Sequence, residues 1–204
     1  LRRGKGSEYE GGIRVPLIVH WPSKVAAGQV IDKPVHIIDL YPTFMEIAGG
    51  DAGSHHLDGA SILSLMDGRG GFDRDAIYMH TPLYIPHYNK TPSSLIRTDD
   101  YKLIYFHGDY LHESDYKTVI PGERYELYRI NEDISEQKNL ADAMPEKTVE
   151  LKSKLHAWLE ETGAQMPVIN PDFDLDDWQF KTSSRLDHQG NVIPQNASKG
   201  QKKK

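Results

Sequence analysis

Lys5 stands in a glycine-flanked loop near the start of the chain, in the run Gly4-Lys5-Gly6-Ser7. Glycines let the backbone approach a ligand closely, and a lysine ammonium is a compact cation suited to an oxyanion such as sulfate or phosphate. The glycine spacing and the residue after Lys5 differ from those of a phosphate-binding P-loop. Taken alone, such a run is more often a surface turn than an anion site.

Residues 79–90 gather two histidines and two tyrosines around two prolines, directly after an apolar run. Tyrosine rings can stack on sugar rings, and an imidazole can hydrogen-bond a hydroxyl or a sulfate oxygen. This composition makes His80 and His87 candidate substrate-binding residues. The alternative is a loop buried under a small sheet, with both histidines in structural roles.

The elements expected around Lys5 belong to an α/β domain. Residues 13–21 are apolar at nearly every position, which predicts a strand covered on both faces. Residues 39–50 predict a helix with Asp39 as its N-cap, and residues 61–66 a further helical turn. The apolar face of the first helix should pack on the sheet through Leu40, Phe44 and Ile47.

The second half of the chain predicts an α+β unit. Short β-like runs cover residues 76–80, 93–98, 101–107 and 125–130, with a tight turn at Asp99-Asp100 between the second and third. A helix is expected over residues 145–162, with its apolar face at Leu151, Leu155, Trp158, Leu159 and Thr162. Together they indicate an antiparallel sheet with one helix packed on it.

Composition divides the chain into three parts. A turn-rich charged segment at residues 67–75 predicts a boundary between residues 1–70 and residues 71–175. Residues 176–204 are expected to form a strap and a disordered basic tail, because residues 181–204 carry six Lys and Arg against one acid. The whole chain has a net charge of −6, which argues against nucleic acid as a partner. No segment has the roughly 20 apolar residues that a membrane helix needs.

The run Gly4 to Pro16, GKGSEYEGGIRVP, closely resembles the second signature region of the sulfatase family. Glu10 and Arg14 flank the double glycine of this run, and we expect them to order the loop through an ion pair. The resemblance continues in order along residues 1–175 through shorter blocks: Trp21-Pro22, Asp39-Leu40-Tyr41-Pro42-Thr43, Leu57-Asp58-Gly59, Tyr101-Lys102-Leu103-Ile104, Glu126-Leu127-Tyr128, Asp133-Ile134-Ser135-Glu136 and Asn139-Leu140-Ala141.

The resemblance implies an alkaline-phosphatase-like fold, with a large α/β domain and a smaller C-terminal subdomain that holds a four-stranded antiparallel sheet and a helix. Residues 1–70 would be the end of the large domain. It implies hydrolysis of sulfate esters on a sulfated small molecule or glycan, a formylglycine nucleophile and a calcium ion. Lys5 matches the family's sulfate-binding lysine. A secreted, periplasmic or lysosomal-type compartment follows from the same resemblance.

The chain departs from the family pattern in one respect that limits its chemistry. The Cys/Ser-centred nucleophile block and the metal-binding Asp-Asn pair are absent before Lys5. We therefore expect this segment alone to be inactive, with no metal site of its own, and to pair with an N-terminal catalytic region or with itself. Two alternatives remain open: a phosphodiester or phosphonate hydrolase of the same superfamily, and a non-catalytic binding module.

Overall fold

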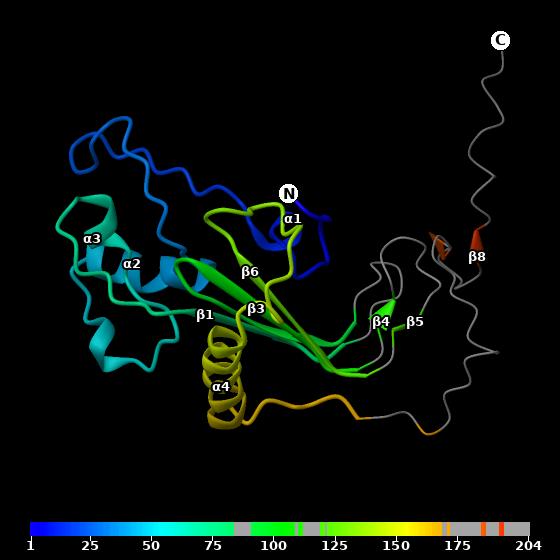
Figure 1. The fold of residues 1–204 in the computed structure, drawn as a ribbon. Coiled ribbons are helices and arrows are strands. Elements are labelled where there is room, and N and C mark those ends of the chain that lie inside the picture. The colour runs from blue at the N-terminus through cyan, green and yellow to red at the C-terminus, as the bar shows by residue number, and fades with distance from the viewer. Residues whose placement is uncertain are drawn as a thin grey trace, which may run out of the picture.

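The computed structural model describes residues 1–83, 91–108, 110–111, 119–120, 122–168, 171, 185–186 and 192–193. His87 lies outside these ranges, as does most of the segment 176–204. Figure 1 shows a central sheet with the long helix α4 on one side and the N-terminal segment with α1 on the other.

The centre of the molecule is a four-stranded antiparallel sheet in the order β1-β2-β3-β6. The strands are β1 (Ile77–Thr81), β2 (Ser93–Arg97), β3 (Tyr101–Phe106) and β6 (Arg124–Arg129). Strand β2 is buried along its whole length, because both faces of the sheet are covered. Two further two-stranded ladders join β4 (Tyr110–Leu111) to β5 (Val119–Ile120) and β7 (Arg185–Leu186) to β8 (Val192–Ile193). The predicted antiparallel sheet is confirmed.

The turn between β2 and β3 falls at Asp99-Asp100, as predicted. The amide of Thr98 donates to the carbonyl of Tyr101 at 2.9 Å, and the Thr98 hydroxyl donates to the same carbonyl at 3.1 Å. Lys33 reaches this turn and pairs with Asp99 at 2.7 Å. The two acids therefore serve a hairpin.

Helix α4 (Pro145–Glu161) covers one face of the sheet. Pro145 fits its first turn, where an amide hydrogen has no intrahelical acceptor. Gly163 follows its end with a φ of +60°, a left-handed conformation that favours glycine. The helix forms one core with the sheet through a shared set of buried side chains: Ile96, Leu103, Tyr105, Leu127, Leu151, Leu155 and Leu159.

The opposite face of the sheet is covered by the N-terminal segment. Tyr9, in the loop before α1 (Glu10–Ile13), is completely buried. It packs in a second core with Leu95, Ile104, Phe106, Tyr128 and Ile130. The sheet is thus the middle of three layers, and the segment that carries Lys5 forms one outer layer.

A smaller group of short helices adjoins the end of the sheet: η1 (Ile37–Asp39), α2 (Leu40–Ile47), η2 (Ala52–Ser54) and α3 (Leu63–Met66). The helical turn predicted at 61–66 is confirmed as α3. Asp39 does not cap α2 with its side chain, which corrects the sequence prediction. Its buried carboxylate accepts from the amides of His36 and Ala60 at 2.7 and 3.0 Å and pairs with Arg74 in a two-pronged contact.

Residues 13–21 do not form the predicted strand, and most of their apolar side chains are exposed. Ile18 is 87% exposed, and on α2 Phe44 is 62% exposed instead of packing on the sheet. A strand needs a neighbour for its backbone groups, and no strand in the described part of the chain lies beside this segment. The apolar pattern is real, but these residues have no covering layer here.

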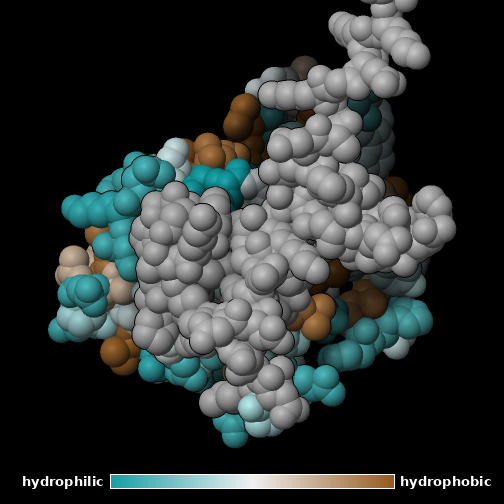
Figure 2. Space-filling model, turned by 90° about the vertical axis from the view of Figure 1, so that its right-hand side faces the viewer, coloured by the Kyte–Doolittle hydropathy of each residue, from teal (hydrophilic) through white to brown (hydrophobic). Residues whose placement is uncertain are grey.

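Further large apolar side chains reach the surface in the first fifty residues, at Val15, Leu17, Val30, Ile31, Ile37 and Tyr41. In the side view of Figure 2, brown hydrophobic groups emerge between teal hydrophilic ones on the described surface. Among the described residues, no helix is both long and apolar enough to traverse a membrane. The division of the chain at residues 70 and 175 stays a prediction.

Candidate functional site

The loop that carries Lys5 is closed at its base by backbone hydrogen bonds. The amide of Gly11 donates to the carbonyl of Arg2 at 3.0 Å, so residues 2 and 11 lie together. Inside the loop, the amide and the hydroxyl of Ser7 both donate to the carbonyl of Gly4, at 3.2 and 2.9 Å. Lys5 lies within this last turn and is exposed. The loop therefore presents Lys5 on a tightly bonded turn.

The double glycine of the motif is explained by the space around it. A Cβ at Gly11 would lie within 3.0 Å of the Arg2 and Arg3 carbonyl oxygens. A Cβ at Gly12 would lie equally close to the carbonyl and hydroxyl oxygens of Ser7 and would be 2.8 Å from Gly4 O. Neither glycine has a positive φ, so glycine is needed here for room.

An arginine fastens the start of the loop to the sheet. The Arg2 guanidinium lies 3.9 Å from the centre of the Tyr9 ring and donates to the hydroxyl of Tyr128 at 2.7 Å. That hydroxyl and the hydroxyl of Tyr9 both donate to one oxygen of Glu126, at 2.7 and 2.8 Å. Burial raises the pKa of Tyr128 to about 12, so the hydroxyl keeps its proton and remains a donor.

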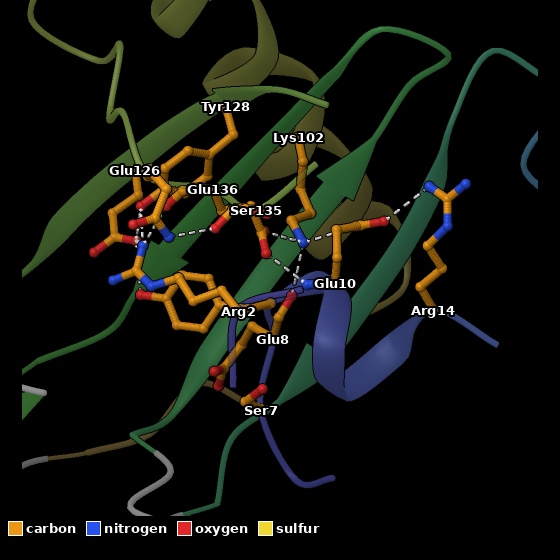
Figure 3. Close-up of polar contacts among 12 residues, drawn as sticks. Arg2, Ser7, Glu8, Glu10, Arg14, Lys102, Glu126, Tyr128, Ser135 and Glu136 are labelled. Carbon is orange, nitrogen blue, oxygen red and sulfur yellow. Dashed lines mark hydrogen bonds and ion pairs between the residues drawn. The ribbon is translucent and has the colours of Figure 1, made fainter. Parts of the chain in front are cut away.

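A buried lysine holds the end of the loop. Lys102, on β3, is completely buried, and its ammonium donates to the carbonyl of Glu8 at 3.0 Å and to the carboxylate of Glu10 at 2.9 Å. It also forms an ion pair with Glu136, whose other carboxylate oxygen accepts from the Glu10 amide at 2.6 Å. Figure 3 shows these contacts converging on the Lys102 amino group beside α1.

The two carboxylates that share Lys102 differ in their surroundings. Burial by itself raises the pKa of Glu10, but Lys102, Arg97 and Arg14 outweigh it and hold that pKa below its ordinary value. Arg14 Nη1 lies 3.3 Å from Glu10 Oε2, which confirms the ion pair expected from the sequence. Burial also raises the pKa of Glu136, and Lys102 does not fully offset it. Glu136 is therefore the first of the two to take up a proton on acidification.

A small cavity of about 30 Å³ opens beside this loop, between it and the ends of β1 and β2. The buried carboxylate of Glu8 accepts from the Ser93 hydroxyl at 2.6 Å at its wall. The remaining lining residues are Ile13, Met79, Thr81, Ser94 and Leu95. This volume suits a water molecule or two and is too small for a sugar.

His80 lies on the other face of the sheet from the Lys5 loop. It stands opposite Ser94, which stands opposite Tyr105 in the core beneath α4. Both ring nitrogens of His80 have partners, the Ser94 hydroxyl at 2.7 Å and the carbonyl of Gln165 at 2.9 Å. His80 thus ties the segment after α4 to the sheet. Its substrate role stays a prediction, and His87 lies outside the described residues.

The same Ser94 hydroxyl contacts a second histidine that the sequence did not single out. His107 Nε2 lies 2.8 Å from Ser94 Oγ, and the His107 ring meets Tyr105 edge-on at 4.2 Å. Burial, followed by the nearby His80, lowers the pKa of His107 to about 4. The imidazole is therefore neutral near neutral pH, as a packed core group.

The calcium that the resemblance implies stays an expectation. No group of three or more His, Cys, Asp or Glu side chains in the described part of the chain could hold a metal ion. The sequence also contains no cysteine from which a formylglycine could form. The candidate residue on this loop is Lys5, and the loop that carries it is held by side chains from β3, β6 and residue 136.

Sequence reasoning missed the supporting residues Arg2, Lys102 and Glu136. Their partners lie 126, 94 and 126 residues away, too far for any local pattern to reveal. One signal existed. Two of the short blocks that follow the motif in sulfatase order, at residues 101–104 and 133–136, contain Lys102 and Glu136.

Comparison with known proteins agrees with this architecture. The family model described as N-sulphoglucosamine sulphohydrolase, C-terminal, matches residues 4–165. A sulfatase of Formosa agariphila is 33% identical over 180 residues, which cover 80% of this chain and 30% of that protein. An ulvan-active sulfatase of the same organism is 28% identical over 82% of this chain and 39% of its own length.

Solved structures give the same result for the fold. BT4656, solved in complex with its substrate D-glucosamine-2-N,6-O-disulfate, superposes with a TM-score of 0.57 at 28% identity. The match covers 78% of this chain and 31% of that one, so the chain spans about a third of the length of these relatives. The residues matched by the family model, 4–165, include the signature loop, the four-stranded sheet and the packed helix, and the chain belongs to the sulfatase family, in its C-terminal region.

Proposed function

We propose that this chain acts as the C-terminal part of a sulfatase that hydrolyses sulfate esters, with Lys5 binding the sulfate group. The observation that carries the proposal is the loop itself. Lys5 is exposed on a turn whose two ends are fastened to the sheet by buried hydrogen bonds and ion pairs. An exposed ammonium on a well-fastened turn suits an oxyanion such as the sulfate group of an ester.

The role proposed for Lys5 is electrostatic. Its ammonium donates to a non-bridging sulfate oxygen and offsets negative charge on the sulfuryl group while the ester bond breaks. A fixed donor needs little reorganisation at that moment, and removal of one such donor typically costs about 3–4 kcal/mol in the transition state. The formylglycine and the calcium are proposed to be supplied by residues outside this chain.

A sulfated carbohydrate is the proposed class of substrate. BT4656 binds a disulfated glucosamine, and the ulvan-active sulfatase is named for its polysaccharide substrate. Both relatives match over three quarters or more of this chain. Lys5 is the residue that this chain is proposed to contribute to such a site, and the cavity beside the loop is too small to hold the sugar itself.

A catalytic region of the sulfatase type is the proposed partner of the exposed apolar surface in residues 13–47. This surface includes Val15, Ile18, Ile37 and Phe44, each more than 60% exposed. Large exposed apolar patches mark contact surfaces for other proteins. A partner that covers this surface would bury Val15 and Ile18, which the strand prediction for residues 13–21 expected to be buried. The segment alone is then proposed to be inactive, because it lacks the nucleophile.

The test is Lys5→Ala in the complete enzyme that contains these residues, assayed on aryl sulfate and on sulfated glucosamine. We expect kcat/KM to fall by about 10²–10³. Lys24→Ala, which removes another exposed lysine, is the matched control and should retain full activity. Wild-type turnover by Lys5→Ala would refute the role of Lys5. Faster turnover of a phosphonate monoester than of either sulfate would favour the phosphonate hydrolase.

A further inference from the structure

We propose that Glu136 is the positioning residue for Lys5: it holds both ends of the Lys5 loop at once and so fixes where the Lys5 ammonium lies. The effect of Glu136 on catalysis rests on the proposed function of Lys5. Its effect on the position of the loop rests only on the contacts described below.

Glu136 contacts the loop at its start and at its end. Its backbone carbonyl accepts from the Arg2 guanidinium at 2.9 Å, and its carboxylate accepts from the Glu10 amide at 2.6 Å. Residues 2 and 11 are joined directly by a backbone hydrogen bond. Glu136 therefore binds both chain segments at the base of the loop, and Figure 3 shows it beside Arg2 and Glu10.

The second carboxylate oxygen of Glu136 contacts the loop indirectly, through Lys102. It pairs with the Lys102 ammonium, which donates to the carbonyl of Glu8, three residues beyond Lys5. Glu136 and Lys102 are both fully buried, so water does not compete for these bonds. A shift of the Glu136 carboxylate would move Glu8 and Glu10 together.

The backbone at Glu136 is held in a conformation that its side chain does not favour. Its φ is +53°, in the left-handed region, where residues other than glycine are uncommon. The surrounding turn enforces it: the Glu136 amide donates to Asp133 O at 3.0 Å, and Leu140 N donates to Leu127 O at 2.8 Å on β6. Strain of this kind persists only where the surroundings over-determine it, and here it aims the carboxylate at the loop.

The decisive experiment is a double-mutant cycle in the complete enzyme with Glu136→Gln and Lys5→Ala. The amide side chain keeps the shape of Glu136 and an acceptor for the Glu10 amide, but it loses the charge that holds Lys102. We expect Glu136→Gln alone to lower kcat/KM by about 10- to 100-fold, mainly through kcat, as expected when a misplaced donor weakens transition-state binding.

The coupling between the two substitutions distinguishes a positioning role of Glu136 from a role in the stability of the fold. In the Lys5→Ala background, Glu136→Gln should cost no more than about twofold, because the group that it positions is gone. Equal fold-losses in both backgrounds, or full activity of Glu136→Gln, would overturn the inference. Glu132→Gln is the matched control, since Glu132 is 64% exposed in a surface pair with Arg129 and lies four residues away.

Hydrogen exchange of the same variants reads the loop directly. Glu136→Gln should raise amide exchange at residues 6–12 by at least about tenfold, as local opening of the loop becomes easier, and Glu132→Gln should not. If Lys5→Ala keeps full activity, the proposed function fails and this measurement alone decides the positioning. Unchanged exchange refutes it. Should Glu136→Gln not fold, Glu136→Asp keeps the charge on a shorter arm and should show the same pattern more weakly.

Discussion

Gly12→Ala tests whether the double glycine is there for room. The new Cβ would lie within 3.0 Å of three oxygen atoms, on Ser7 and Gly4, closer than real Cβ contacts come. Two of these atoms belong to backbone that is fixed on both sides, so the loop itself must move. The movement strains three hydrogen bonds: the two from Ser7 to the Gly4 carbonyl and the one from Gly12 N to Tyr9 O at 2.7 Å.

The size of the effect follows from those bonds. Loss of one of these bonds costs about 1 kcal/mol net, and forcing an extra methyl into packed structure costs about 1–3 kcal/mol, so with one bond broken and the others bent we expect a loss of about 2–4 kcal/mol. For a chain of this size, that lowers Tm by roughly 4–16 °C. Urea unfolding followed by circular dichroism would give the free energy, and differential scanning calorimetry would give Tm.

Gly4→Ala is the matched control within the same loop. A Cβ at Gly4 meets no atom within 4 Å, and its φ is not positive. We expect its free energy of unfolding to stay within about 0.5 kcal/mol of the wild type, as is usual for surface substitutions. If Gly12→Ala proved as stable as Gly4→Ala, the close approach of the loop to Gly12 would be wrong, and with it the explanation of the motif.

Three further predictions concern the scaffold. Leu155→Ala should lower the free energy of unfolding by about 2–5 kcal/mol because it empties the core under α4, whereas Val149→Ala, 60% exposed, should change it little in the same urea titration. Because the pKa of His107 is lowered to about 4, the unfolded chain binds a proton before the folded one does, so stability should fall as pH drops from about 6.5 to 4; a flat profile would contradict its burial. Burial by itself raises the pKa of Asp39, but Arg74 and two backbone amides outweigh it and lower that pKa. The stability that this contact contributes is therefore present above about pH 4 and lost as pH falls below it. Asp39→Asn should abolish that acid-dependent loss of stability.

The sheet and α4 were predictable from sequence because their partners are each other. The short β-like runs in residues 76–130 predict the sheet, and the leucine face of residues 145–162 predicts the helix. These two surfaces pack against each other within this chain. Residues 13–21 failed for the opposite reason. Their apolar run predicted a buried strand, but most of these side chains are exposed here. A strand forms only beside another strand, and pattern alone does not supply one.

The site was half predictable. The motif predicted the Glu10–Arg14 ion pair, whose two members lie four residues apart and which the structure confirms, whereas the role of Lys5 stays a prediction. The residues that fasten the loop were invisible to local pattern, because a lone Lys102 or Glu136 looks in sequence like an ordinary surface charge. Only burial of the whole network turns them into partners, and burial is a property of the folded chain.

The distance along the chain between Arg2 and Tyr128 has a consequence for biosynthesis. The two residues are 126 positions apart, so at about 5–20 residues per second the ribosome makes Tyr128 roughly 6–25 seconds after Arg2. During that interval the Lys5 loop has no sheet to fasten to. Its order must come late, after β6 and the turn at Glu136 have emerged, and the turn that carries Lys5 is therefore among the last parts of this chain to assemble.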